Sequence, residues 1–450
     1  MRGIFASFAG SAIARGALAV ALATGVVAGG MTVGVGVAEA KKEKAPKPGT
    51  YSKEFSAAAT PLQKTVMEID AIKKRKGTAE ELRAAAATGP AELAAAEAAI
   101  QNPTDRMGFG NWALMVGGAL GDSVLQQRGI QSMLASGLVA PGQVTEFQFY
   151  VGSLGYNNRD YQAVVGALPA VVAANYADDS AAELLADAYD KLGQPVQGLD
   201  ALKSAIAARQ AAGGVVPENW YTRGNTIAYN AKLGEQSVEW SRMLAGAYPS
   251  DIAWLGAGQV AREFGGEFGN QESVDLGRLF VRTGGLRADP KFAEREYVEY
   301  IEAASKVGLP AEVVKIAQMG VDAGVLNKTD PFVADAVGRT MVASAEKDRA
   351  AAAADERAAR ASADGKSALA TGDVYLSLGD AAKAEEMFKL ALEKNVADRD
   401  RALTRLGIAQ IDQDKFAEAK ATLAQVGGIR TNLAKLFWAY ADSEERATAQ

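Results

Sequence analysis

The sequence predicts an all-α fold, an α-solenoid of stacked antiparallel helical hairpins. Apolar residues recur with the period of a helix along most of the chain, and no run of alternating β-branched residues indicates a strand. One hairpin pattern is written twice within residues 365–428, and a weaker form of it recurs at a spacing of 34 residues earlier in the chain. A single hairpin cannot bury its apolar face, so we expect the copies to stack on one another.

The clearest hairpins are the two near the C-terminus, whose six pattern positions have the same offsets and lie 35 residues apart. In the first copy they are Gly372, Tyr375, Gly379, Ala384, Phe388 and Ala391, and in the second Gly407, Gln410, Asp414, Ala419, Leu423 and Val426. Small residues such as Gly372 and Ala384 let two antiparallel helices approach closely, while bulky ones such as Phe388 fill the space between hairpins. The pattern resembles the tetratricopeptide repeat (TPR). This resemblance implies a right-handed superhelix whose concave side, lined by the first helix of each hairpin, binds partner peptides.

Three weaker copies precede these two. Gly118, Gly152 and Ala186 take the small mid-helix position, and Leu134, Leu168 and Leu202 take the bulky position, each set at a spacing of 34 residues. After a longer loop at 211–217 the phase shifts, and further helical pairs are expected at 220–248, 253–283 and 290–325. Together these copies predict TPR-like repeats over residues 108–330, with an N-terminal helical cap over 56–107.

The segment 331–364 is charged and rich in alanine, and two interpretations of it stay open. Alanine is the strongest helix former, and Glu356 and Arg360 stand four residues apart in the order that stabilises a helix. These features favour one long helix, whereas a mobile linker would let the C-terminal repeats swing. Beyond the two repeats, residues 429–443 carry the apolar stripe of a capping helix for the last hairpin.

The N-terminus has the features of an export signal. Arg2 and Arg15 carry positive charge, and the run that follows contains no charged side chain up to Ala38-Glu39-Ala40, which fits the small-x-small cleavage rule. We therefore expect a signal peptide over residues 1–40, cleaved after Ala40, and a flexible linker over 41–55. The product would be an exported bacterial protein of the periplasm without stable membrane insertion. An uncleaved anchor is the alternative, since an uncharged run of this length can span a bilayer.

The chain of 450 residues contains no His and no Cys. That composition excludes Ser-His-Asp and Cys-His triads and the usual imidazole and thiolate metal sites, so we expect neither a metal nor another cofactor. Carboxylates that could act in pairs are Glu294, Glu296, Glu299, Glu302, Glu385 and Glu386. They lie on predicted helices, where a solvated face is the expected role. The net charge of −6 gives no indication of nucleic-acid binding, and we expect no enzymatic activity.

The resemblance to TPR proteins also implies which residues meet a partner. Relative to the small mid-helix residue, the exposed inner positions have offsets of −3, +1, +4 and +5. Applied to the copies around Gly152, Ala186 and Gly224, these offsets give the candidate residues Phe149, Tyr156, Asn157, Glu183, Asp187, Asp190, Lys191, Tyr221, Asn225 and Tyr229. Aromatic rings beside amide and acidic groups can hold an extended or helical peptide, and the carboxylates favour a basic one.

We therefore expect a scaffold that binds a protein or peptide in the bacterial periplasm or cell envelope and supports envelope assembly or export. Two alternatives stay open. One is a carbohydrate-active enzyme, or its helical accessory arm, acting on cell-wall glycan, which would require a buried glutamate in a cleft. The other is a structural role in which the groove closes by self-association into a homo-oligomer.

Overall fold

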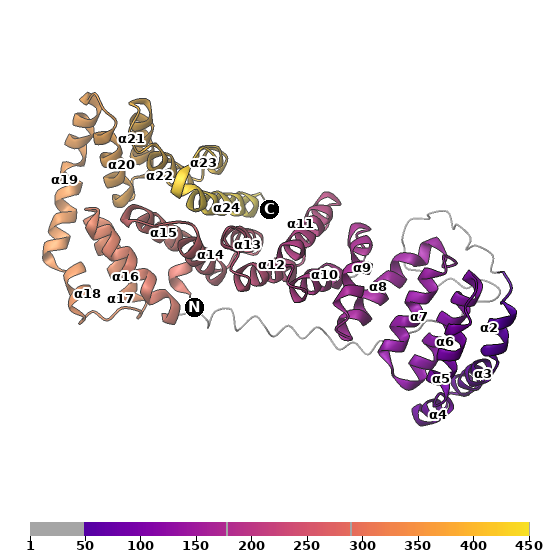
Figure 1. Cartoon of the computed structure of the whole chain (residues 1–450). Helices are drawn as coiled ribbons and strands as arrows, with labels where there is room; N and C mark the ends of the chain where they lie inside the picture. Colours follow the sequence, from indigo (N-terminus) through magenta and orange to yellow (C-terminus); the bar gives the residue numbers. More distant parts are fainter. Residues whose placement is uncertain (1–48, 177–178, 289, 450) are drawn as a thin grey trace. The chain divides into compact units, whose positions relative to one another are not determined.

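The structure, a computed structural model, describes residues 49–176, 179–288 and 290–449 (Figure 1). Every regular element in these ranges is a helix, so the all-α prediction is confirmed. The expected signal peptide and its cleavage point lie outside the described residues. Within the described ranges, no helix is both long and apolar enough to cross a membrane. The chain divides into two compact units, unit 1 over residues 1–220 and unit 2 over residues 221–450.

Unit 1 is a succession of helical hairpins. Its helices are α2 (Lys53–Ala58), α3 (Thr60–Lys74), α4 (Ala79–Ala85), α5 (Gly89–Ala98), α6 (Pro103–Leu120), α7 (Ser123–Ala135), α8 (Pro141–Asn157), α9 (Tyr161–Ala173), α10 (Ser180–Lys191) and α11 (Pro195–Ala211). The pairs α6–α7, α8–α9 and α10–α11 form hairpins, and each hairpin packs on the next. Capping side chains set the helix starts: Asp122 accepts hydrogen bonds at the start of α7, and Asp160 does so at the start of α9.

The first helices of unit 1, where an N-terminal cap is expected over residues 56–107, pack around α6. Phe55, Leu62 and Ile69 of α2 and α3 are fully buried in the apolar core that these helices share with α6. Asp105, in the first turn of α6, accepts hydrogen bonds of 2.9 and 2.8 Å from the backbone N–H and the hydroxyl of Ser52. Because Ser52 caps α2, the chain is already ordered before residue 55, and the expected linker ends earlier than the sequence indicated.

Glycines in the middle of one helix let the bulky residue of its partner come close, as the repeat pattern predicts. The pairs are Gly152–Leu168, Gly224–Trp240, Gly372–Phe388 and Gly407–Leu423, in which an added Cβ atom would lie 2.2–2.6 Å from the bulky side chain. Carbon atoms in a folded protein do not approach so closely without strain. Glycine is therefore required at these positions by packing between the two helices of each hairpin.

The first of the expected copies has a different register. Gly118 is exposed, and it does not face Leu134. Helices α6 and α7 cross instead at Gly110 and Gly129, where a Cβ atom added to either glycine would lie 2.6 or 2.7 Å from the carbonyl oxygen of the other. Two glycines facing each other let the two backbones touch, so the close contact moves away from the position that the 34-residue spacing predicts.

Unit 2 begins within α12 (Glu218–Asn230). Its other elements are α13 (Gly234–Ala247), α14 (Asp251–Phe264), α15 (Asn270–Thr283), η1 (Gly285–Arg287), α16 (Pro290–Lys306), α17 (Pro310–Asp322), α18 (Pro331–Ala336), α19 (Arg339–Ala361), α20 (Lys366–Leu378), α21 (Ala381–Glu393), α22 (Arg399–Ile411), α23 (Phe416–Leu423), η2 (Gly428–Arg430) and α24 (Thr431–Thr448). The two repeats expected over 365–428 are α20–α21 and α22–α23. The expected capping helix is α24, which continues to Thr448.

The alanine-rich segment 331–364 forms α18 and α19, and α19 is held at its C-terminal end. The Nζ atom of Lys394 lies 2.8 Å from the carbonyl oxygen of Ala359, to which it donates a hydrogen bond. A cation at this end also interacts favourably with the helix dipole. One turn earlier, Glu356 pairs with Lys383 of α21 at 2.9 Å. These contacts fix α19 to the C-terminal repeats as a docked helix.

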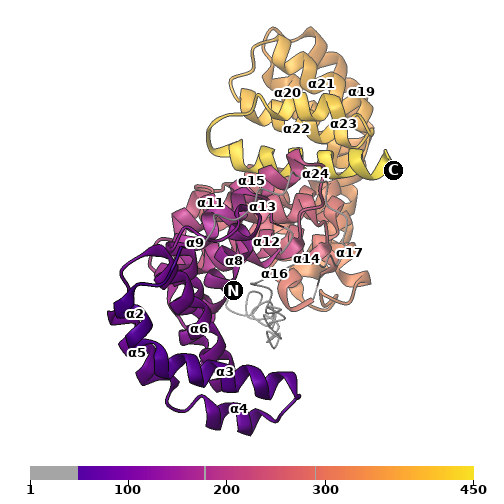
Figure 2. The same ribbon diagram turned by 90° about the vertical axis from the view of Figure 1, so that its right-hand side faces the viewer.

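The last helices of unit 2 turn back along its first helices (Figures 1 and 2). Helix α24 packs on α13, α14 and α15, which lie far from it in the sequence. The rings of Trp254 and Tyr440 meet edge-on with centroids 5.8 Å apart, and Arg446 donates a hydrogen bond of 2.6 Å to the carbonyl oxygen of Gly246. In an open solenoid each repeat contacts only its neighbours. Unit 2 is therefore a solenoid that closes on itself.

Candidate partner-binding surface

The candidate residues of unit 1 lie on α8 and α10, and two of them are joined directly. The hydroxyl of Tyr156 donates a hydrogen bond of 2.7 Å to Oδ2 of Asp187. The ring of Tyr156 also meets the ring of Tyr161 edge-on, with centroids 5.8 Å apart. The structure thus brings together a phenol and a carboxylate that stand 31 positions apart in the chain.

Polar groups continue along both helices. Glu183 of α10 accepts a hydrogen bond of 2.5 Å from the side-chain amide of Asn219, at the start of α12. Asp190 is partly exposed and Lys191 is exposed at the C-terminal end of α10, while Asn157 is exposed at the end of α8. The surface of α8 and α10 therefore carries amide and carboxylate groups beside aromatic rings.

Two candidates of unit 1 are buried, although exposure was expected for them. Phe149 has an exposed fraction of 9% and Asp187 one of 7%. The ring of Phe149 lies against Tyr150 and Tyr176, with centroids 6.0 and 5.3 Å apart, in the apolar core of α8, α9 and α10. Exposure is therefore the wrong expectation at both positions, because Phe149 packs between hairpins and Asp187 lies beneath the Tyr156 hydroxyl.

Three candidates lie on α12, in unit 2. Tyr221 is buried with its ring edge-on to Tyr248 at 5.9 Å, and Tyr229 is half-buried. Asn225 is 8% exposed, and its Oδ1 atom accepts no hydrogen bond within the described part of the chain. Exposure is also the wrong expectation for Tyr221 and Asn225, because α12 approaches α13 closely at Gly224 and draws the adjoining positions into the core.

Three residues near α8 were not among the candidates. The hydroxyl of Tyr150 donates a hydrogen bond of 3.3 Å to Oε1 of Glu146, and burial together with this carboxylate raises the pKa of Tyr150. Tyr176, which follows α9, packs on Phe149. The spacing of four between Glu146 and Tyr150 is visible in the sequence of a helix, whereas only the fold brings Tyr176 to α8.

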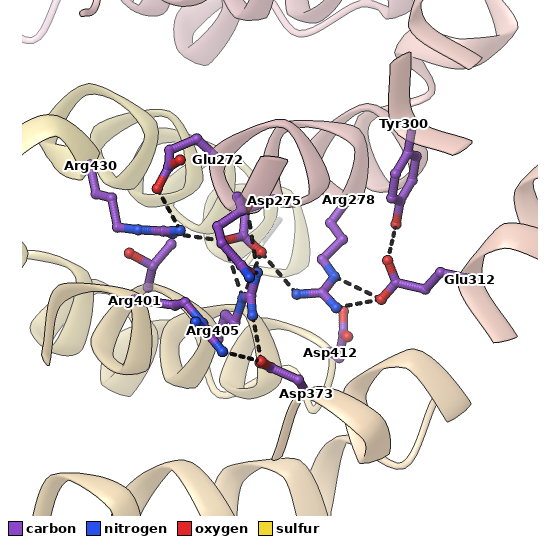
Figure 3. A network of polar contacts seen from close by, with 12 residues as sticks. Glu272, Asp275, Arg278, Tyr300, Glu312, Asp373, Arg401, Arg405, Asp412 and Arg430 are labelled. Atoms are coloured by element: carbon purple, nitrogen blue, oxygen red, sulfur yellow. Dashed lines mark hydrogen bonds and ion pairs between the residues drawn. The ribbon is translucent and has the colours of Figure 1, made fainter. Parts of the chain in front are cut away.

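Unit 2 contains a second polar cluster, which joins helices that are far apart in the sequence (Figure 3). At its centre lies Asp275 of α15, whose fully buried carboxylate accepts hydrogen bonds from three guanidinium groups. Arg278 of the same helix donates at 2.8 Å, Arg405 of α22 at 3.0 Å and Arg430 of η2 at 2.7 Å. Burial alone would raise the pKa of Asp275, but Arg405, Arg430 and Arg278 hold it well below its usual range.

The cluster extends from Asp275 towards the C-terminal repeats. Glu272, one turn before Asp275, pairs with Arg430 at 2.8 Å. Asp373 of α20 lies 2.7 Å from both Arg405 and Arg401. Buried carboxylates and guanidinium groups thus alternate between α15, η2, α22 and α20, so that each charge has an opposite charge beside it.

The cluster also extends in the other direction, towards α16 and α17. Arg278 pairs with Glu312 of α17, which in turn accepts a hydrogen bond of 2.9 Å from the hydroxyl of Tyr300. Burial and the Glu312 carboxylate raise the pKa of Tyr300 well above its ordinary value. At the rim, Arg282 donates at 2.7 Å to Asp412, which directly follows α22, and the two side chains are 17% and 28% exposed.

Two glutamates that were expected on solvated faces are buried. Glu296 is 3% exposed, pairs with Arg262 and accepts a hydrogen bond of 3.0 Å from Gln259. Glu385 is 4% exposed and pairs with Lys415 at 2.7 Å. The expectation is wrong for these two because cations from neighbouring repeats compensate their charge inside the packing. The other four glutamates are exposed or half-buried.

Two kinds of small ligand can be considered for the described residues, a metal ion and an organic molecule. No group of three or more Asp or Glu side chains in these ranges stands where it could hold a metal ion. A cavity of about 40 Å³ lies between Arg278, Tyr300 and Lys315. That volume suits one or two water molecules and is far below the few hundred Å³ of a typical organic-ligand site.

A scan against protein-family models and a search of curated proteins gave no match. Among solved structures, the chain is similar to the TPR2AB domain of yeast Sti1 in complex with pHSP90, at 14% identity and a TM-score of 0.24, covering 67% of this chain and 99% of that one. It is similar to Naa15/Naa10 bound to HypK at 13% identity and a TM-score of 0.31, covering 88% and 73% of the two chains. It is also similar to the human IFIT1 dimer with PPP-AAAA at 12% identity and a TM-score of 0.20, covering 88% of this chain and 96% of that one. Similarities this distant carry no argument about function. The TPR-like α-solenoid is defined by the helical hairpins themselves.

Proposed function

We propose that this protein is a non-enzymatic scaffold that binds a protein or peptide partner on the α8–α10 surface of unit 1. The observation that carries the proposal is the pair formed by Tyr156 of α8 and Asp187 of α10, with Glu183 also on α10. The phenol ring comes from the α8–α9 hairpin and the two carboxylates come from the α10–α11 hairpin, so two repeats contribute adjoining groups. Partly exposed rings serve as anchors in binding surfaces. Buried Asp187 fixes the ring of Tyr156, and the partly exposed carboxylate of Glu183 can accept hydrogen bonds from the partner.

The charge of this region favours a basic partner. Over residues 111–200, the described side chains include the carboxylates Asp122, Glu146, Asp160, Asp179, Glu183, Asp187, Asp190 and Asp200, against the cations Arg128, Arg159 and Lys191. An excess of negative charge attracts a cationic segment at long range and orients it on approach. The partner of this proposal is therefore a protein segment that carries Lys or Arg residues.

The proposal includes export and a role in envelope assembly or export in a bacterial periplasm. This part rests only on the charge pattern and cleavage motif of the first forty residues. Detection of the mature N-terminus at Lys41 in a periplasmic extract would support it, whereas the uncleaved chain in the cytoplasm would contradict it.

The buried glutamates of unit 2 support a scaffold over a glycan-active enzyme. A general acid requires a carboxyl group whose pKa is raised by an apolar pocket. Within the described residues the buried glutamates are Glu272, Glu296, Glu312 and Glu385, and each of them pairs with an Arg or Lys side chain. A carboxylate that is packed against a cation does not lie in the apolar pocket that a general acid requires.

A peptide titration tests the proposed surface. Fluorescent peptides of about 15 residues, identical except that Lys and Arg are exchanged for Glu, are titrated with the full chain. We expect the basic peptide to bind and the acidic one not to bind. The Glu183→Gln/Asp190→Asn variant should weaken binding of the basic peptide by about fivefold or more, because rim charges contribute up to about 1 kcal/mol each.

The control is Glu54→Gln/Asp200→Asn, which removes the same charge from exposed positions on α2 and α11. If the control weakens binding as much as the α10 variant does, net charge and not this surface is responsible, and the proposal fails. It also fails if a folded parent binds neither peptide at concentrations up to about 1 mM, where any specific contact would be weaker than about 4 kcal/mol.

A further inference from the structure

The inner positions of the C-terminal repeats are occupied by other helices of the same chain. Counted from Gly372, offsets +1, +4 and +5 correspond to Asp373, Leu376 and Ser377. Leu376 and Ser377 line the small cavity that Arg278 of α15 and Tyr300 of α16 line from the other side. In a TPR-like hairpin these are positions that would meet a partner, and here α15 and its neighbours cover them.

Helix α15 meets this face with two carboxylates one helical turn apart. Glu272 and Asp275 are three positions apart, so they project from the same side of α15. Across the contact, Arg430 pairs with both of them at 2.8 and 2.7 Å, and Arg405 bonds to Asp275 at 3.0 Å. Arg405 also donates to the side-chain oxygen of Gln271 at 2.7 Å. The α15 segment is therefore bound by its acidic side chains, as an acidic peptide would be (Figure 3).

The contact is polar and incompletely bonded. Nη1 of Arg405 and Nη2 of Arg430 lie at ion-pair distance from carboxylates but are not oriented to donate a hydrogen bond to them. Nε of Arg401 and Oδ1 of Asp373 have no hydrogen-bond partner in the described residues. Of these atoms only Nη2 of Arg430 faces α15, where it lies beside Glu272, and an ion pair without a hydrogen bond holds the helix less firmly than a fully bonded one would. When the contact opens, water can solvate the charges on both sides.

We propose that α15 is an internal ligand of the C-terminal repeats, and that an acidic helical segment of a partner displaces it. The segment would carry two carboxylates three residues apart, in the places of Glu272 and Asp275, to pair with Arg405 and Arg430. The closed contact is then autoinhibitory, because the inner face becomes available only when the contact of α15 with α22 and η2 opens, while α15 stays packed on α14 and α16. This surface is in unit 2, takes an acidic partner and does not depend on the proposed function of α8 and α10.

A peptide competition tests the displacement. The probe is a fluorescent peptide with the sequence of residues 268–284, and the titrant is the full chain. Tethered α15 competes at an effective concentration on the order of 1 mM, so we expect weak binding to the parent. In the Glu272→Gln/Asp275→Asn variant the internal ligand lacks the two carboxylates, and the Kd for the peptide should fall by about tenfold or more. A peptide with the same two substitutions should bind neither protein.

The variant must be folded for this comparison, which its circular dichroism shows. If the folded variant binds the peptide no better than the parent does, the inference is wrong. It is also wrong if the substituted peptide binds as well as the peptide with the natural sequence, because binding would then not depend on the two carboxylates.

A second measurement keeps both carboxylates of α15 and serves if the Glu272→Gln/Asp275→Asn variant unfolds. The chain contains no Cys, so spin labels can be placed on full-length protein through Lys315→Cys and Ala417→Cys, at exposed positions of α17 and α23. We expect one distance between the two labels without peptide and a second, longer distance as the 268–284 peptide reaches the millimolar range. A distance that stays constant at every peptide concentration would overturn the inference.

Discussion

The substitution Asp275→Asn tests how much the closure of unit 2 depends on its central carboxylate. An amide can still accept a hydrogen bond from Arg405 or Arg430, but it cannot balance their charge. Removing one partner of a buried ion pair costs about 3–5 kcal/mol, because the remaining charge is left without compensation. Asp275 is fully buried and contacts three guanidinium groups, so we expect a loss within this range in the free energy that holds α15 to α22.

Hydrogen exchange measures this loss locally, which matters because a long repeat chain does not unfold in a single step. A loss of 3–5 kcal/mol corresponds to exchange that is about 10² to 4 × 10³ times faster at the protected amides of α15 and α22. The control is Asp412→Asn, which removes the partner of Arg282 at the rim, where the side chain is 28% exposed. Because exposed pairs contribute about 1 kcal/mol or less, it should accelerate exchange by less than about tenfold.

The reasoning would be refuted if Asp275→Asn and Asp412→Asn accelerated exchange equally. It would also be refuted if exchange in Asp275→Asn increased evenly through α2 to α9, since the buried cluster does not reach these helices of unit 1.

Two further predictions concern packing and pH. Gly224→Ala should lower the free energy of unfolding by about 1–3 kcal/mol, because the new Cβ atom would lie 2.2 Å from the ring of Trp240. Gly256→Ala should stabilise α14 by up to about 1 kcal/mol, because its new Cβ atom would have nothing within 4 Å. Urea unfolding of both variants checks this prediction, and equal effects would contradict it. The Lys383 hydrogen bond lowers the pKa of Glu356 to about 2, and pairing with lysines against the opposing effect of burial lowers that of Glu385 to about 2. Because both values lie below the unfolded value of 4.5, the stability from these groups is present above about pH 4.5 and is lost as the pH falls towards 2. Thermal unfolding between pH 6 and 2 should show this loss, and the Glu356→Gln/Glu385→Gln variant should lose less over the same interval.

The local part of the fold could be predicted because it depends on neighbouring positions. The spacing of 16 between Gly372 and Phe388 reports a contact within one hairpin, and the structure contains it. The copy around Gly118 was assigned a wrong register because α6 and α7 cross at a pair of glycines. A periodic pattern marks where a small residue recurs, but it does not show which of several nearby glycines makes the closest approach.

The closure of unit 2 could not be predicted. Arg405 and Asp275 are 130 positions apart, and no local pattern links them. Charged residues on helices usually belong to solvated faces, so the sequence also predicts a surface position for Glu296 and Glu385. A single sequence does not show that Arg262 and Lys415 pair with them inside the packing. Among the candidate residues, Asn157 and Lys191 are exposed, whereas Phe149 and Asp187 are buried by contacts that the spacing of one sequence does not reveal.

Hydrogen exchange of the full chain with and without the basic peptide tests the central claim most directly, namely that a partner binds unit 1 while the inner face of unit 2 is closed. We predict that the bound peptide slows exchange at the amides of α8 and α10 and leaves those of α20 and α22 unchanged. Slower exchange confined to α20 and α22 would contradict both the assignment of the surface and the closure of unit 2.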